Sequence, residues 1–365
     1  MLEKGKISAF QLGIMMYPTV LATGFLALPM ITSEKAHNDL WMTPVIASLS
    51  GFIAIYVAMK LHELYPKETV NQYSKHIIGN IPGYVLSLVY VLVNAYSTGL
   101  IARQYAEFVK SCFLFKTPIL IIIFSILLLA AFAVRGGVEI LARSAVIFTP
   151  IFILPLSILL LLIPEMDMRN VLPVMEHGII PVIKGAIVPQ AWFSELFLIS
   201  YFLPLLTDLK KSRKWSVISL CVIVVTMIFV DLISLFLLGS DTENKIYPIL
   251  IAIRYISVAN FFENLESLLL AMWVVGNFIK ISVFYYIAVL SIAQSLKLSE
   301  YRPFVFPMGL FILVFSFWDI ASFSYLGFIL KVISPLFLSL FYMLIPLLLL
   351  TLAVLRKRKT TSEGT

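Results

Sequence analysis

The sequence has few charged residues, two cysteines and four histidines, and each scarcity excludes a class of protein. Charged residues are 13% of the 365 positions, whereas a soluble domain carries about 25%. Cys112 and Cys221 fall in or at the ends of different apolar runs, which predicts neither a disulfide framework nor a metal site. The histidines are scattered without metal-ligand spacing, and no nucleophile or phosphate-loop motif occurs. We therefore expect no enzyme, no metal and no cofactor.

Apolar residues, in contrast, are 61% of the chain. A transmembrane helix needs about 20 mostly apolar residues, and the chain divides into about ten such runs. The sequence predicts an all-α integral membrane protein with almost nothing outside the bilayer. The expected helices lie near residues 8–32, 41–64, 83–111, 118–134, 139–163, 182–207, 214–239, 264–294, 303–319 and 324–355. The first run is too long for a signal peptide, so we expect it to be retained. An amphipathic stretch at 247–258 is expected to lie along a surface.

The net charge of +7 comes from basic clusters between or after apolar runs, which argues against a nucleic-acid partner. Lys and Arg gather at 210–214 and again at 356–359, next to the last run. Such loops stay on the cytoplasmic side of a membrane. With ten helices both basic termini lie there, and residues 356–365 form a basic tail that suits anionic lipids.

Two apolar runs contain residues that interrupt helices. Thr19–Gly24 and Pro29 lie in the first run, and Gly185–Gln190, with Pro189, lies in the sixth. Interrupted helices at matching places in two halves indicate an inverted-repeat transporter fold. We expect one transmembrane domain over 1–355, with repeats at about 8–163 and 182–355. The alternative is that these residues are ordinary close-packing or kink positions.

The order of several short motifs resembles the B subunit of the GerA-type spore germinant receptors, in the amino acid–polyamine–organocation transporter superfamily. The matching stretches are Leu21–Pro29, Ala106–Lys110, Thr117–Ile119, Gly136-Gly137 with Ala142-Arg143, Pro173-Val174 with Gly178 and Pro181, Glu263, Glu266-Ser267, Trp273 and Tyr325–Gly327. One departure is that Ala22 and Thr23 precede Gly24, where the family often has glycine on both sides of the break. The ligand therefore cannot be carried over from a relative.

The resemblance implies a leucine-transporter-like five-plus-five fold and a sensor more than a pump. Such subunits are thought to recognise a small-molecule germinant, an amino acid being our expectation, together with an A subunit and a lipoprotein C subunit in the spore inner membrane. Two other functions stay open. One is an active proton- or cation-coupled amino-acid transporter, and the other is a membrane scaffold with a vestigial pocket.

The first candidate site is the break in helix one, formed by Leu21, Ala22, Thr23 and Gly24. Its exposed N–H groups and the positive end of the following half-helix suit a carboxylate. A glycine-mediated helix contact is the alternative reading.

Helix six contributes the residues past its break: Pro189, Gln190, Trp192, Ser194 and Glu195. A carboxylate within a membrane is costly and usually faces a partner or a wet cavity. Glu195 is a candidate to bind a ligand ammonium or a proton, and a buried structural pair is an equal alternative.

Helix eight contributes Asn277 and Lys280. Lys280 is a candidate to attract a carboxylate, and the resemblance implies that it sits where other superfamily members hold sodium. The alternatives are that Lys280 pairs with Glu195, or that its side chain extends towards the membrane–water interface.

Helix three carries Tyr96 and Ser97, for which the resemblance implies a wall of the site with Tyr96 as a lid. Polar contact between helices is equally expected. Arg103 and Glu107 have the i, i+4 spacing of a salt bridge. The lone charges Asp231 and Lys331 are either relays or packing pairs, and the sequence does not choose.

Overall fold

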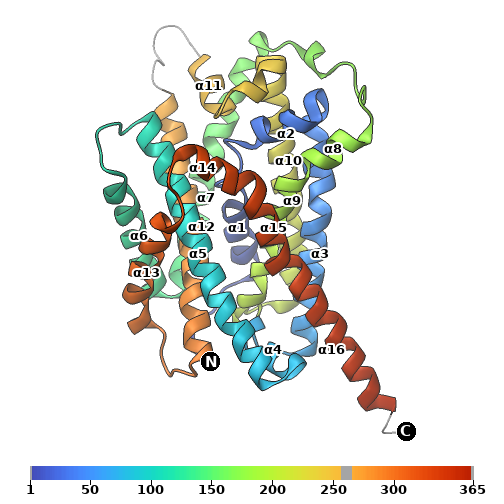
Figure 1. Ribbon diagram of the computed structural model, residues 1–365, viewed down its shortest axis with the longest axis vertical. Coiled ribbons are helices and arrows are strands. Elements are labelled where there is room, and N and C mark those ends of the chain that lie inside the picture. Colours follow the sequence, from blue (N-terminus) through green and yellow to red (C-terminus); the bar gives the residue numbers. More distant parts are fainter. Residues whose placement is uncertain (1, 256–264, 363–365) are drawn as a thin grey trace.

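The structure is a computed structural model that describes residues 2–255 and 265–362, and the regular structure in these residues is helical (Figure 1). The first half holds α1 (Ala9–Leu21), α2 (Leu28–Ala36), η1 (His37–Met42), α3 (Thr43–Leu64), α4 (Val70–Ile78), α5 (Asn80–Cys112), α6 (Ile119–Gly136) and α7 (Val138–Ile158). Next come η2 (Leu159–Glu165), η3 (Met168–Val171), α8 (Ile179–Gly185), α9 (Ile187–Ser194), η4 (Glu195–Tyr201), η5 (Leu203–Leu205), η6 (Leu209–Lys211), α10 (Ser212–Leu238), η7 (Gly239–Asn244) and α11 (Pro248–Tyr255). The chain closes with α12 (Glu266–Ser295), η8 (Arg302–Phe304), α13 (Val305–Trp318), α14 (Phe323–Phe328), η9 (Ile329–Ile333), α15 (Ser334–Ser339), η10 (Leu340–Leu344) and α16 (Ile345–Ser362).

By length and composition, seven helical stretches of the described residues are suited to cross a membrane, and one bent pair brings the number to eight. The expected first span is absent from this set because it is split into the short helices α1 and α2. The second half, α2, continues through η1 into α3 as one apolar stretch, Leu28–Leu64. The multi-span architecture is confirmed, whereas the count of ten stays a prediction.

The last expected helix, 324–355, has more internal structure than its sequence suggests. It runs from Phe323 to Ser362 and contains two π-helical segments, η9 and η10. Extra residues in a helical turn shift the register of the side chains that follow. Of the expected surface stretch at 247–258, α11 forms Pro248–Tyr255, and positions 256–258 lie outside the described residues.

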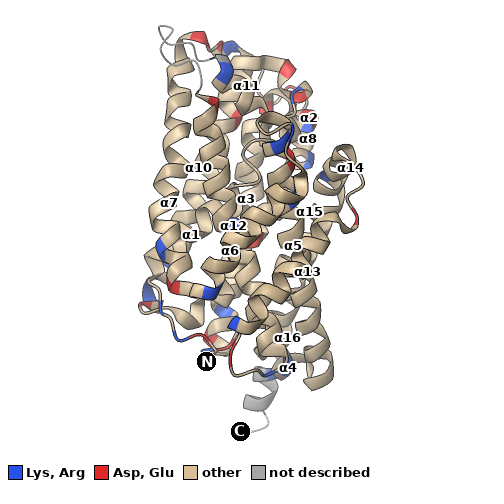
Figure 2. Cartoon of the chain, turned by 90° about the vertical axis from the view of Figure 1, so that its left-hand side faces the viewer, with Lys and Arg blue, Asp and Glu red and all other residues tan. Residues whose placement is uncertain are grey.

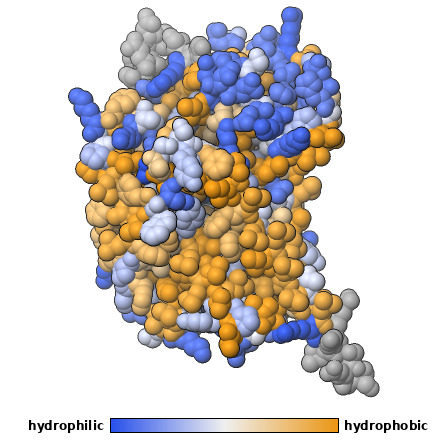
Figure 3. Space-filling view, viewed as in Figure 1, coloured by the Kyte–Doolittle hydropathy of each residue, from blue (hydrophilic) through white to orange (hydrophobic). Residues whose placement is uncertain are grey.

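The surface divides into two polar ends and an apolar middle. Charged residues gather at the two ends (Figure 2), and apolar side chains cover most of the face between them (Figure 3). The chain begins near the end where α4 and α16 finish, which we call the termini face, and α2, α8 and α11 lie at the opposite end, the far face (Figure 1). An apolar belt of this kind is what a bilayer requires.

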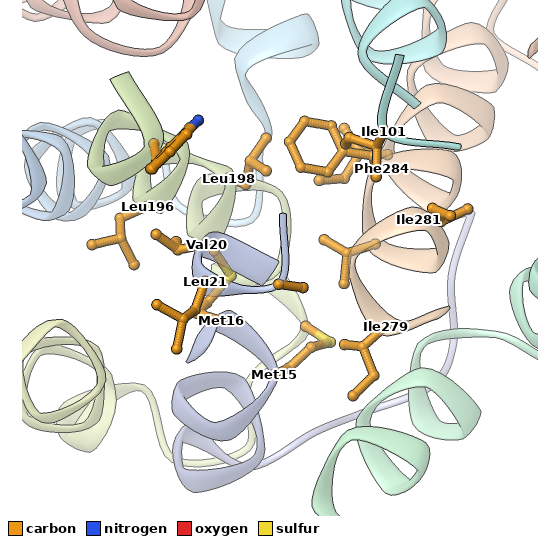
Figure 4. Packing of buried hydrophobic residues seen from close by; sticks show 14 of the residues in the cluster. Met15, Met16, Val20, Leu21, Ile101, Leu196, Leu198, Ile279, Ile281 and Phe284 are labelled. Atoms are coloured by element: carbon orange, nitrogen blue, oxygen red, sulfur yellow. The ribbon is translucent and has the colours of Figure 1, made fainter. Parts of the chain in front are cut away.

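Helix α1 lies in the interior of the bundle, packed against α7, α10 and α12. Its buried side chains meet apolar side chains from three other elements, α5, η4 and α12 (Figure 4). The labelled residues of this core are Met15, Met16, Val20 and Leu21 of α1, Ile101 of α5, Leu196 and Leu198 of η4, and Ile279, Ile281 and Phe284 of α12.

The N-terminal segment is bound across the termini face through Glu3. This buried carboxylate accepts hydrogen bonds from the Gly5 and Val138 N–H groups and from the Tyr286 and Tyr301 hydroxyls, at 2.8–3.3 Å. Burial, and then the Glu3 charge, raise the pKa of the Tyr301 hydroxyl, so it remains a donor. The carboxylate therefore joins the start of the chain to three other segments.

Replacing Glu3 with alanine should lower the free energy of unfolding, because buried donors lose their acceptor. Each such group costs about 1–3 kcal/mol, and thermal unfolding of the detergent-solubilised chain measures the loss. Glu300→Ala is the matched control, since Glu300 is exposed and forms only a surface pair with Arg302. Equal midpoints for the two variants would contradict the role given to Glu3.

Candidate functional site

The break in the first span covers residues 22–27, between α1 and α2. Within it, the Gly24 N–H donates to the Leu21 carbonyl and the Ala27 N–H to the Gly24 carbonyl, both across three residues. The Thr23 and Leu26 N–H groups donate no hydrogen bond to another described residue. Pro29, in the first turn of α2, sits where a proline is tolerated. The unwound segment therefore offers free backbone donors in a buried place.

Position 24 requires glycine because a neighbouring side chain approaches the backbone closely there, and not because the backbone angle is unusual. A Cβ atom at this position would lie 2.8 Å from two ring carbons of Trp192 on α9. On the other side, a Cβ at Gly276 of α12 would lie 3.2 Å from the Ala22 Cβ and 2.4 Å from the Phe152 ring. The two interrupted spans and α12 thus meet at the break, as expected from their sequences.

The break in the sixth span is a bend. Ile179–Gly185 and Ile187–Leu205 meet at 45°, and after Ser194 the chain continues as the 3-10 helix η4. Pro189 and Ser194 are buried. The Ser194 hydroxyl donates to the Ala191 carbonyl at 2.6 Å, and the Gln190 carbonyl accepts from the Ser50 hydroxyl at 2.7 Å.

Glu195 and Lys280 form an ion pair in the interior of the bundle. Their Oε2 and Nζ atoms are 2.7 Å apart, and the side chains are 4% and 1% exposed. Lys280 Nζ also lies 5.7 Å from the centre of the Phe284 ring. The pairing is one of the alternatives that the sequence left open. Because both charges are desolvated, neither tolerates loss of its partner.

Asn277 lies one turn before Lys280 on α12. Its Nδ2 donates to the Trp273 carbonyl at 2.9 Å, while its Oδ1 is buried and has no hydrogen-bond partner in the described part of the chain. A buried amide oxygen without a donor is unusual. It lies next in sequence to Gly276, where α12 touches the break.

The Tyr96 side chain contacts residues of the last two spans. Its hydroxyl donates to Asp319 Oδ2 at 2.7 Å, and its ring packs edge-on against Phe315 and Phe337. The structure therefore places it between α5, α13 and α15, in a polar contact between helices. Ser97 is buried on the same helix.

Sequence reasoning missed Gln104, whose Nε2 donates to the Thr23 carbonyl at 3.0 Å. It stands next to Arg103, whose expected bond to Glu107 is present at 2.9 Å. It also missed an aromatic wall, in which Phe25 packs against Phe152 and Trp273. No spacing rule finds these partners, because they come from helices far apart in the chain.

Lys331, a lone charge in the sequence, pairs with Glu34 of α2 at 2.7 Å. Both side chains are partly exposed, at 35% and 42%. The pair joins α2, the far-face half of the broken span, to η9. The two breaks, the buried pair and this far-face pair define the candidate site.

Solved transporter structures share this architecture. MhsT in complex with L-phenylalanine aligns over 93% of this chain and 88% of its own, with a TM-score of 0.68 and 13% identity. A Na+-coupled sialic acid symporter aligns over 93% of this chain and 79% of its own, with a TM-score of 0.66 and 12% identity. The chain therefore has the leucine-transporter-like inverted-repeat fold that its sequence predicts.

Sequence comparison identifies the family. The model of the family described as "Spore germination protein" matches residues 6–324. Spore germination protein KB of Bacillus subtilis is 28% identical over 100% of this chain and 99% of its own length. Spore germination protein XB of Bacillus anthracis is 23% identical over 93% and 96%. The chain belongs to the spore germination protein family.

Proposed function

We propose that the chain is the germinant-sensing subunit of a spore germination receptor, and that it binds a small molecule at the break between α1 and α2. The observation that carries this proposal is the meeting of Gly24 with Trp192, next to backbone donors that have no partner. Such donors suit an anionic group, and a transporter-like fold places its ligand at the interrupted helices.

The ligand class that best suits these groups is an amino acid. The free Thr23 and Leu26 N–H groups offer a carboxylate its hydrogen bonds, and Glu195 offers an ammonium its charge. An incoming ammonium competes with Lys280 for Glu195, so binding rearranges the buried pair. The L-phenylalanine held by MhsT supports this class by likeness of fold.

Signalling then needs other proteins, because the described residues form a bundle with no separate domain. A ligand that binds one conformation better than another shifts the population towards it. We propose that the A subunit and the lipoprotein C subunit of the same receptor read this shift in the spore inner membrane. The basic termini lie on the core side in this arrangement.

The test is binding of radiolabelled L-amino acids to the chain in proteoliposomes. Under this proposal, at least one should bind saturably, and Glu195→Gln combined with Lys280→Met should weaken binding by about tenfold or more, because it removes the charge offered to the ammonium and charged hydrogen bonds contribute about 1.5–3 kcal/mol. Ser157→Ala is a control, because the Ser157 hydroxyl bonds only its own helix. Unchanged binding in the double variant would contradict the site.

A second candidate function, coupled amino-acid transport, is favoured by the fold shared with a Na+-coupled symporter. Uptake by the same proteoliposomes separates the two functions. Accumulation driven by a proton or sodium gradient would establish transport, while binding without accumulation would support the sensor.

A further inference from the structure

Asp231 is a fully buried carboxyl group that the proposed binding site does not use. It lies on α10, and its side chain is 0% exposed. Among the residues that the structure describes, Oδ2 has no hydrogen-bond partner, and Oδ1 has one, the Thr32 hydroxyl of α2, at 3.3 Å. No Lys, Arg or His side chain of the described residues forms a salt bridge with it. An isolated carboxylate in such a place is strongly disfavoured relative to its neutral form.

The hydrogen bonds of Thr32 also favour the neutral form of Asp231. A hydroxyl carries one hydrogen, and Thr32 Oγ1 lies closer to the Leu28 carbonyl, at 2.9 Å, than to Asp231. If that hydrogen goes to Leu28, the contact with Asp231 is a hydrogen bond only when Asp231 carries the proton. A neutral carboxyl then donates to Thr32 and leaves a bare carbonyl oxygen, which tolerates burial far better than a charge.

The titratable groups on the elements packed around α10 are engaged elsewhere or exposed, apart from His62, which is buried near the end of α3 and forms no salt bridge with Asp231. Tyr17 of α1 bonds Thr226. Asp39 of η1 accepts from the Met175 N–H. Glu34 and Lys35 of α2 pair with each other, and Glu34 also pairs with Lys331. The remaining groups are His37 of η1, Tyr56, Lys60, His62 and Glu63 of α3, Glu165 of η2, Arg169 of η3, Lys210 and Lys211 of η6, Asp241 and Glu243 of η7, and Arg254 of α11. Of these, Lys60 pairs with Glu63, Asp241 with Lys245 and Arg254 with Glu266.

A polar cavity lies close to Asp231 on the far face. A cavity of about 200 Å³ there is lined by Ser33, next in sequence to Thr32, and by Leu235, one turn after Asp231. His37 and His177 line the same cavity. The carboxyl group is thus one helical turn from a polar cavity lined by groups able to exchange protons.

We propose that Asp231 is a proton-binding site whose occupied form holds α2 against α10. Release of the proton to the cavity leaves a charge that needs water, and water reaches it only if α2 moves away. The far-face half of the broken span therefore packs tightly when Asp231 is protonated and loosens as the pH rises. The Glu34–Lys331 pair holds the opposite side of α2. This inference does not depend on the identity of the germinant.

Two measurements on the full chain in lipid nanodiscs test the proposal. Infrared difference spectroscopy should detect the carbonyl stretch of a protonated carboxyl at neutral pH, and Asp231→Asn should remove it. Asp241→Asn is the matched control, because Asp241 is exposed and forms a salt bridge with Lys245, and it should leave the signal unchanged. Hydrogen exchange of residues 24–36, corrected for intrinsic rates, should rise with pH in the wild type and stay flat in Asp231→Asn. Loss of the Thr32 contact should accelerate it roughly tenfold.

The absence of the protonated-carboxyl signal from the wild type would overturn the proposal, as would its persistence in Asp231→Asn. Exchange of α2 that depends on sodium and not on pH would assign the site to a metal cation and overturn it equally. The wild-type measurements decide the question even if the variant fails to fold. A loss of α2 protection that follows the titration of the signal would support the proton site.

Discussion

Replacing Lys280 with methionine is expected to lower the free energy of unfolding by about 3–5 kcal/mol, because it leaves Glu195 buried without its cationic partner, so that the carboxylate must either stay charged in the interior or take up a proton. Methionine keeps much of the length of the lysine side chain, so the loss measures the charge more than the packing. The measurement is unfolding of the solubilised chain in denaturing detergent, followed by circular dichroism.

Two further variants make this prediction specific. Lys331→Met removes the same charge from a partly exposed pair of equal length, 2.7 Å, and should change stability by only about 0–1 kcal/mol. Glu195→Gln combined with Lys280→Met removes both buried charges and should recover much of the stability lost in the single variant. If the double variant is no more stable than Lys280→Met, the loss arises from packing and not from an unpaired charge.

The buried pair also shows how far sequence reasoning reached at this site. Glu195 and Lys280 stand out because charges are rare in apolar helices, so their types mark them before any contact is known. Their pairing was one of several alternatives, and the structure selects it. A charged residue in an apolar helix can therefore be identified from the sequence alone. Its partner can be predicted only where few other charged residues are available to pair with it.

Other contacts had no such signal. Thr32 and Asp231 are 199 positions apart, and Glu34 and Lys331 are 297 apart. For Tyr96 the sequence left a lid and a polar contact between helices open, and its hydroxyl reaches Asp319, 223 positions away. Helical periodicity fixes which residues share a face, but the neighbour of that face depends on how whole helices pack. The breaks were predictable because glycine and proline act locally on the backbone.

The local rule also accounts for the form of the first span, which is expected at 8–32 and lies at 9–36 with a break in the structure. The run from Ile7 to Ile31 is mostly apolar, so a hydropathy criterion joins it into one helix. Hydropathy does not register that two N–H groups between α1 and α2, those of Thr23 and Leu26, form no helical hydrogen bond with a described residue. Such backbone is tolerated within a bundle only where protein or a cavity surrounds it, and this is why the break is the strongest pointer to the site.

Replacing Gly24 with leucine should abolish the response to germinant, because the new side chain and the Trp192 ring cannot occupy the same space. Even the first added carbon would lie 2.8 Å from two ring atoms, and an aromatic ring within a packed bundle has little freedom to move. Overpacking of this kind costs about 1–3 kcal/mol, so Gly24→Ala should give an intermediate phenotype. The dose–response of spores carrying each variant measures the effect, and unfolding midpoints of the purified chains show whether folding survives.

Gly327→Leu is the matched control, since a Cβ at Gly327 would meet no atom within 4 Å. It should leave stability within about 0.5 kcal/mol of the wild type and the dose–response unchanged. A folded Gly24→Leu chain that responds normally would show that the ligand does not bind against this face of Trp192. A folded chain that is unresponsive, and that regains a response when Trp192→Ala is added, would place the ligand between the two interrupted helices, because only the paired substitution restores the lost space.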